Sequence, residues 1–428
     1  MVSRGLRYVI GVVLSLNFLA YWAVPVAGMG SLYKYGLVKV GRPLFEWLDA
    51  VPALRAFAAK HVYAKEQFND FFIMSVLTTA SMLISLAVLL RQQLAHGYLP
   101  WWMIFAYYCQ WVGLGGRSMG TAYTMAHKEG HNVMLYQRWF RRFVGNWFEN
   151  KLGVFYGNVP YNFQTSHVHI HHKLDGGVGD TFYQWDLDRS SLSDFMLYVY
   201  RIMLHMCGYS SLRYFAATQR KGMYDKLRAG CVHYWVYVPA ALLLVTKSAS
   251  FVFFVFLQPL VCMTTFLALL NFGFHGFVEF DEDGNSIPAV NSTCIIEGDD
   301  DSWGEDDHNT HHYSTTVYHR DLPAHHKTKI ADFAKHKGSV FRGLSILELS
   351  IFLLAGDFDR LASHFVDYSG TMSRAEVAAL LEARAKRKEM TYDEYEALLA
   401  SGKVYALAEG KAKPAEARAA AQAALAGQ

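Results

Sequence analysis

Long apolar runs without Asp, Glu, Lys or Arg are the most regular feature of this chain. Five such runs occur, at residues 8–29, 71–90, 97–116, 229–246 and 248–278. Because about 20 apolar residues are needed to cross the roughly 30 Å hydrocarbon layer, each run predicts a membrane-spanning helix. The second and third runs predict a hairpin, and the last two, separated by the lone Lys247, predict another. The expected fold is therefore all-α and polytopic, with an N-terminal spanning helix and two hairpins.

The first run also resembles the hydrophobic part of a signal peptide. It is long for such a segment, and no small-residue cleavage site follows it. We therefore expect it to be retained as a spanning helix.

Three other segments mix apolar and charged positions, which is typical of helices at a membrane surface. They are residues 137–151, 191–214 and 341–355. The first places aromatic side chains among four cations, Arg138, Arg141, Arg142 and Lys151, so we expect it to lie in the interface. Its cations are expected to contact lipid phosphates, or else the phosphate of an acyl carrier or coenzyme A. The second pattern fits an interfacial helix and a soluble core helix equally well.

The composition changes to Ala, Glu, Lys and Arg from residue 371 onward, which predicts a soluble helical tail, partly disordered. The expected organisation is an N-terminal spanning helix with an interfacial segment (1–70), a catalytic membrane domain (71–370) and this tail (371–428). Residues 31–70 are richer in Lys and Arg than residues 1–7. The positive-inside rule therefore puts 31–70 on the cytoplasmic side of a bacterial inner or plasma membrane. We expect the segments between the spans to form a helical cap on the same side, and this cap to hold the active site.

Composition excludes several classes of protein. Hydrophobic residues make up 52% of the chain and charged residues only 18%, too apolar a balance for an ordinary soluble surface. The net charge is +3 and no basic run is interleaved with aromatics, so nucleic-acid binding is not expected. The five cysteines are scattered and never form CxxC, which argues against a disulfide framework or a zinc ribbon.

The histidines are the main candidate functional residues of this sequence. Of 19 histidines, nine fall into three clusters and one further position. These candidate metal ligands are His127 and His131, then His167, His171 and His172, then His275, and finally His308, His311 and His312. Residues three or four apart share one face of a helix, so we expect His127/His131, His167/His171, Asn271/His275 and His308/His311 each to point at one place. Nine imidazoles exceed the needs of one ion, and two ions of five or six coordination would use nearly all of them.

The other histidines show no repeated ligand spacing. They are His61, His96, His205, His233, His319, His325, His326, His336 and His364. His169 lies inside the second cluster, but a helix would turn it away from its neighbours. We expect none of these ten to bind the metal pair.

The clusters read HKEGH, HVHIHH and HNTHH, and with the NFGFH segment they resemble the integral-membrane fatty acid desaturase and hydroxylase superfamily. The stretch GEDDHNTHH is similar to the GEGxHNxHH of stearoyl-CoA desaturases, and the resemblance covers residues 71–312. It implies two non-haem iron ions, O2 as co-substrate, a fatty acid or fatty acyl thioester as substrate, and desaturation as the reaction. It also implies that His275 binds a metal directly and that Asn271 reaches one through water.

The histidine clusters combine features of different branches of that superfamily. The HxxxHH spacing of the second cluster is similar to alkane monooxygenases, whereas Glu129 and Gly130 make the first cluster similar to desaturases. Hydroxylation of an alkane or fatty acid, and decarboxylation of a fatty acid to a 1-alkene, therefore stay open beside desaturation. A metal transporter is the alternative from another class, although its ligands would be expected near the middle of the spans.

Acidic residues near the clusters are candidate partners for the far ring nitrogens of the ligand histidines. They are Glu129, Asp180, Glu305, Asp306 and Asp307, and we take Asn271, Glu129 and Asp307 as the candidate catalytic residues. The acidic run 299–301 is expected to be a solvated loop. Since no haem, dinucleotide or iron–sulfur motif occurs, electrons are expected from a separate ferredoxin- or cytochrome-type protein with its reductase.

Overall fold

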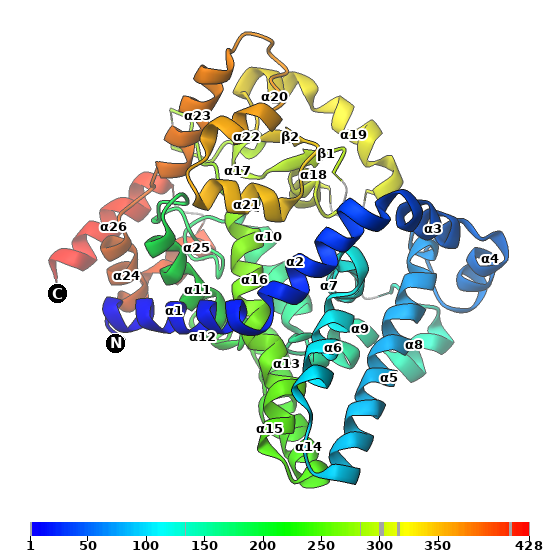
Figure 1. Ribbon diagram of the computed structural model, residues 1–428. Coiled ribbons are helices and arrows are strands. Elements are labelled where there is room, and N and C mark those ends of the chain that lie inside the picture. The colour runs from blue at the N-terminus through cyan, green and yellow to red at the C-terminus, as the bar shows by residue number, and fades with distance from the viewer. Residues whose placement is uncertain are drawn as a thin grey trace.

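The computed structural model describes residues 2–132, 134–282, 284–298, 304–314, 317–410 and 413–427. The described chain is mostly helical, as predicted, with two short strands. The strands, β1 (Cys294–Ile296) and β2 (Val340–Arg342), pair in parallel with Cys294 opposite Val340. Figure 1 shows α16 (Gln258–Phe274) running through the middle of the molecule, with the short strands and most of the later helices gathered around its upper end.

Within the described residues, three helices are long and apolar enough to cross a membrane. They are Glu66–His96, which ends in α5 (Phe72–His96); Lys221–Thr246, which runs from α13 (Lys221–Val232) to α14 (Val238–Thr246); and Ala249–Phe274, which runs from α15 (Ala249–Val252) to α16. In Figure 1 the ends of α5, α14 and α15 reach the same lower side of the molecule. These helices match the second, fourth and fifth predicted spans.

The predicted span at 97–116 is not one continuous helix. The one α-helix within it is α6 (Trp101–Val112), followed by the short 3-10 turn η3 (Leu114–Gly116), and the 12 residues of α6 cover about 18 Å at 1.5 Å per residue, short of a bilayer. Gly113, Gly115 and Gly116 follow with φ of 73°, 61° and 74°, a left-handed backbone that ends a helix. The chain then restarts as α7 (Arg117–His131), which carries the first histidine cluster.

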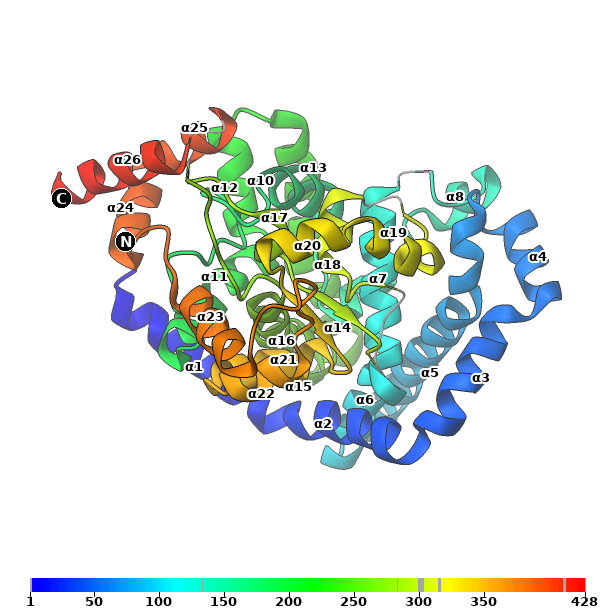
Figure 2. The same cartoon turned by 90° about the horizontal axis from the view of Figure 1, so that it is seen from above.

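The predicted N-terminal span is bent. Its two parts, α1 (Arg4–Tyr21) and α2 (Ala23–Ser31), belong to helices that meet at 50°, so they make at most one broken span. α1 packs on α16 and on α11 (Leu192–Met206), where Gly11 allows the backbones to touch at Met196. In Figure 1 α1 crosses α16 instead of running beside it, and in Figure 2 α1 and α2 follow one flank of the molecule.

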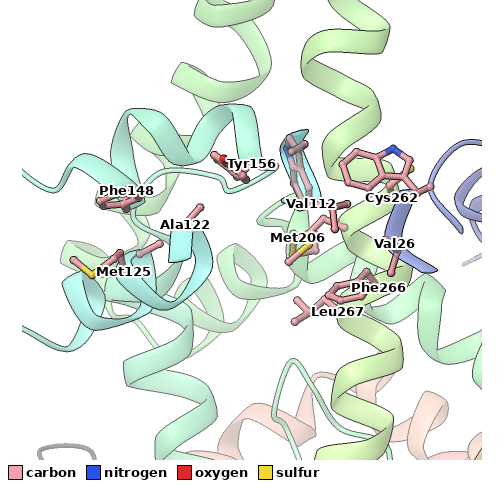
Figure 3. Packing of buried hydrophobic residues seen from close by; sticks show 14 of the residues in the cluster. Val26, Val112, Ala122, Met125, Phe148, Tyr156, Met206, Cys262, Phe266 and Leu267 are labelled. Carbon is pink, nitrogen blue, oxygen red and sulfur yellow. The ribbon is translucent and has the colours of Figure 1, made fainter. Parts of the chain in front are cut away.

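The hydrophobic core joins the spans to the segments that carry the histidines. Figure 3 shows Phe266 and Leu267 of α16 packed near Val26 of α2 and Met206 of α11, with Met125 of α7 in the same cluster. Both Met125 and Met206 are buried. Helices that bring histidines from distant parts of the chain therefore share one packed interior.

The region after residue 371 is folded against the rest of the protein. It forms α23 (Arg374–Lys386), α24 (Tyr392–Ser401), α25 (Lys403–Gly410) and α26 (Pro414–Ala426). The backbone N–H of Arg189 donates to the Ala385 carbonyl, and the buried Arg384 donates to Glu279 at 2.7 Å. These contacts differ from the expected partly disordered tail.

Candidate metal centre

The nine predicted ligand histidines lie on four segments that the fold brings together. These are the end of α7, the π-helical segment η5 (Phe163–His171) with α10 (His172–Leu174), the residue after α16, and α18 (His308–Tyr313). The rings fall into two groups, in each of which the ligand atoms lie within 4.8 Å of one another. The five-histidine group is His127, His131, His167, His172 and His311, and the four-histidine group is His171, His275, His308 and His312.

The two groups are adjacent. Their membership differs from the prediction, because histidines of one sequence cluster belong to different groups. We expected His167 and His171 to share a group, whereas His167 is grouped with His172. The physical reason is the π-helical backbone of η5, in which hydrogen bonds run from i to i+5, so α-helical spacing does not describe its faces. The prediction for α18 also differs. His308 shares a group with His312, four residues later, and not with His311, three residues later. His169 belongs to neither group.

Within each group several ring nitrogens approach as closely as ligands of one ion. The Nε2–Nε2 distances are 2.9 Å for His172–His167 and His172–His311, and 3.0 Å for His308–His275 and His308–His312. Two nitrogens that bind one ion at about 2.1 Å each, about 90° apart, are separated by about 3 Å. The spacing therefore fits coordination to a shared ion of more than four ligands.

The far nitrogens of four of these rings face acceptors. The Nδ1 contacts are His127 to Glu305 at 2.9 Å, His171 to Asp180 at 2.8 Å, His275 to the Asn291 carbonyl at 3.0 Å, and His312 to Asp175 at 2.8 Å. An acceptor at Nδ1 keeps the proton there, so Nε2 presents a lone pair. Lone pairs converging at these distances repel each other unless a cation lies between them. The converging Nε2 atoms of the two groups therefore fit two bound metal ions.

Burial keeps several of the rings in the form that binds metals. Burial, with a smaller contribution from neighbouring imidazoles, lowers the pKa of His131 to about 2 and that of His275 to about 3. The pKa values of His167, His308 and His311 are shifted well below the ordinary value for the same reasons. Neutral imidazole is the ligand form of histidine, so protons do not compete for these nitrogens near pH 7.

Glu305 and Asp180 contact histidine rings, as predicted. Burial alone would raise the pKa of Glu305, but the charge of Lys128 and the hydrogen bond with the His127 ring outweigh it and hold that pKa below its usual range. Burial likewise opposes ionisation of Asp180, and His171 with two backbone N–H groups lowers its pKa. The N–H donors belong to Gly176 and Phe182, both 2.9 Å from the carboxylate. Both carboxylates are thus held charged against a ring nitrogen.

Glu129 and Asp307 bond elsewhere, which corrects their predicted role as ring partners. The buried Glu129 accepts hydrogen bonds from the Tyr136 hydroxyl and from the N–H groups of Phe148 and Glu149. Burial raises its pKa to about 8, although those donors oppose the shift. Asp307 caps α18, accepting from the Thr310 N–H at 3.0 Å and the Thr310 hydroxyl at 2.7 Å. These two residues stabilise the segments that carry the histidines. Asp306, which precedes Asp307 in the chain, is buried.

Three further positions complete the site. The Asn271 side chain lines the adjoining cavity and donates to the Leu267 carbonyl at 3.0 Å. The sequence prediction missed Asp175 and Asn291 as partners of His312 and His275, because neither stands at a recurrent distance from a cluster. The acidic run 299–301 lies outside the described residues.

A cavity of about 410 Å³ opens beside the histidines. Four of them line it (His127, His167, His171 and His308), and much of its remaining wall is apolar, including Met263, Phe266, Leu267 and Leu270. It continues to Lys34 and Glu348, an ion pair with an N–O distance of 2.7 Å whose side chains are each 30% exposed. Its volume falls in the range of small-molecule sites, about 300 to 1,000 Å³. The cavity therefore connects a partly exposed mouth to both histidine groups.

Comparison with protein-family models, with curated proteins and with solved structures gives no match to this chain.

Proposed function

We propose that this chain is a membrane-bound non-haem di-iron oxidoreductase that uses O2 to oxidise an unactivated C–H bond of a fatty acyl chain. The observation that carries the proposal is the pair of converging histidine groups beside a largely apolar cavity. Imidazole suits iron among the borderline metals, and iron, unlike zinc, is redox-active. The three histidine clusters and the NxxxH segment, which resemble the desaturase and hydroxylase superfamily, support the same assignment.

The two irons, when bound, would supply the redox chemistry that activates O2, with electrons from a separate donor protein. The five-histidine group would hold one ion and the four-histidine group the other. Glu305 and Asp180 keep protons on the Nδ1 atoms of His127 and His171, so that Nε2 stays free to bind metal. Asn271, at the cavity wall, is assigned to hold a water molecule at the edge of the centre.

The cavity wall is assigned to hold the acyl chain and to exclude water from it. Phe266 and Leu267, on successive positions of α16, belong both to this wall and to the buried core. A chain held between these side chains presents a fixed carbon to the metal pair, which decides the outcome of the reaction. Removal of two hydrogens gives desaturation, which we favour. Hydroxylation and decarboxylation to a 1-alkene are the alternatives at the same site.

The site is assigned to the cytoplasmic face, at the upper end of α16 in Figure 1. α8 (Arg138–Val144) supports a membrane interface nearby, because Trp139 is 52% exposed and Phe143 is 74% exposed among basic residues. Exposed aromatic rings beside cations suit the lipid headgroup layer.

Feeding a panel of fatty acids to cells that express the chain tests this function. We expect fatty acids with a new double bond, detected by gas chromatography and mass spectrometry, and substrate-dependent O2 uptake by the purified, iron-loaded protein. Hydroxylated acids or 1-alkenes would select an alternative outcome at the same site. Robust metal flux into vesicles without O2 uptake would contradict the proposal and favour a transporter.

A further inference from the structure

Three other potential metal ligands converge apart from the nine histidines. They lie in the cap, by which we mean β1, β2 and the helices from α17 (Pro288–Asn291) to α22 (Phe358–His364) around the upper end of α16 in Figure 1. They are Cys294 on β1, Asp307 at the start of α18 and His326 on α19 (Leu322–Thr328), and their donor atoms lie within 4.8 Å of one another. Cys294 is fully buried, and Asp307 and His326 are each 7% exposed. Thiol, carboxylate and imidazole from three separate segments thus face one buried point.

The geometry fits a tetrahedral ion. The Cys294 Sγ is 3.4 Å from the His326 Nδ1. Sulfur bound at about 2.3 Å and nitrogen bound at about 2.0 to 2.1 Å, at a tetrahedral angle, are about 3.5 Å apart. The other ring nitrogen of His326 is 2.8 Å from the Tyr368 hydroxyl, which fixes the ring with Nδ1 toward the thiol. Such an outer partner is usual for a histidine that binds metal.

We propose that Cys294, Asp307 and His326 bind a third divalent cation of the zinc type, separate from the two histidine groups. A donor set that includes sulfur favours zinc or a similar borderline ion, whereas the histidine groups offer nitrogen alone. Binding displaces the thiol proton to solvent, so the bound sulfur is a thiolate. Three protein ligands leave the fourth position to water.

The position of this site indicates a structural role. β1 pairs with β2, and Asp307 caps the helix that carries His308, His311 and His312. A cation held by Cys294, Asp307 and His326 ties β1 and α19 to the start of that helix. It would therefore stabilise the part of the cap from which both histidine groups draw ligands.

Cobalt substitution tests the proposal without measuring enzyme activity. The full-length protein in detergent is depleted of metal, loaded with Co²⁺ and examined by absorption spectroscopy. We expect a thiolate-to-cobalt charge-transfer band in the near ultraviolet that Zn²⁺ removes. The histidine groups contain no sulfur and cannot produce this band. A cobalt-loaded protein without such a band would overturn the proposal.

Two variants and a control locate the band. Cys294→Ser is expected to lose it, and Cys109→Ser, which removes a half-buried thiol from α6, is expected to keep it. His326→Ala retains the thiol and is expected to lose or shift the band. An unchanged band in Cys294→Ser or His326→Ala would contradict the assignment. Because the band reports only sulfur ligation, the result stands apart from whether the histidine groups bind iron.

Discussion

His171→Ala and His311→Ala are each expected to reduce turnover by more than about 100-fold and to lower the iron content. Each removes one ring, from the four-histidine and the five-histidine group respectively. Changes at partners of ligand histidines already cost 10- to 100-fold, so loss of a ligand itself should cost more. His171→Ala leaves three imidazoles in its group and His311→Ala leaves four, so we expect the greater iron loss in His171→Ala. Iron analysis and O2 uptake of the purified variants measure both effects.

The matched control is His96→Ala, at the end of α5. His96 is exposed and belongs to neither group, so this variant should keep wild-type iron content and turnover. His326 is a poorer control, because it lies in the third cluster of potential ligands. Iron loss of equal size in His96→Ala and the two ligand variants would refute the ligand assignment.

Gly130→Ala is expected to disrupt the centre by separating two of its segments. Gly130 lies between His127 and His131 on α7, where a Cβ atom would be 2.6 Å from the Phe163 Cβ and 3.1 Å from the Phe163 carbonyl carbon. The added methyl group therefore pushes α7 away from η5, which carries His167. We expect the free energy of unfolding to fall by about 1 to 3 kcal/mol, and iron content and turnover to fall with it. Thermal unfolding and iron analysis check these expectations.

Gly222→Ala is the control for this substitution. Gly222 is also helical, on α13, and its Cβ would meet nothing within 4 Å. Alanine there should leave iron content unchanged and should not lower the melting temperature. Equal iron content and equal melting temperature in Gly130→Ala and Gly222→Ala would contradict the claim that close packing of α7 on η5 positions the histidines of the first two clusters.

The helical class and the set of clustered histidines could be predicted because both depend on local pattern. Apolar runs identified three spans, and the repeated spacing marked the nine histidines that the structure gathers. The division of the rings could not be predicted, because it depends on the π-helical backbone of η5 and on which of two allowed spacings, three or four residues, pairs the rings of α18. The break after α6 was missed because the run was treated as uniformly helical, although Gly113, Gly115 and Gly116 at its end all have positive φ.

Long-range contacts account for the other differences. The Ala-rich composition after residue 371 resembles a solvated tail, yet Val377 and Leu381 on one face of α23 are buried against the cap. Arg384 on the same helix is 3% exposed and ion-paired with Glu279. Composition does not reveal such partners. The same holds for Asp175 and for the convergence of Cys294 with His326, since their neighbours are distant in the chain.

The most direct measurement is an anomalous diffraction map, collected at the iron absorption edge, from crystals of the iron-loaded protein in lipid. The account predicts two iron peaks, one enclosed by His127, His131, His167, His172 and His311, and the other by His171, His275, His308 and His312. Peaks elsewhere in the chain, or a single iron bound by a few of these rings, would contradict it.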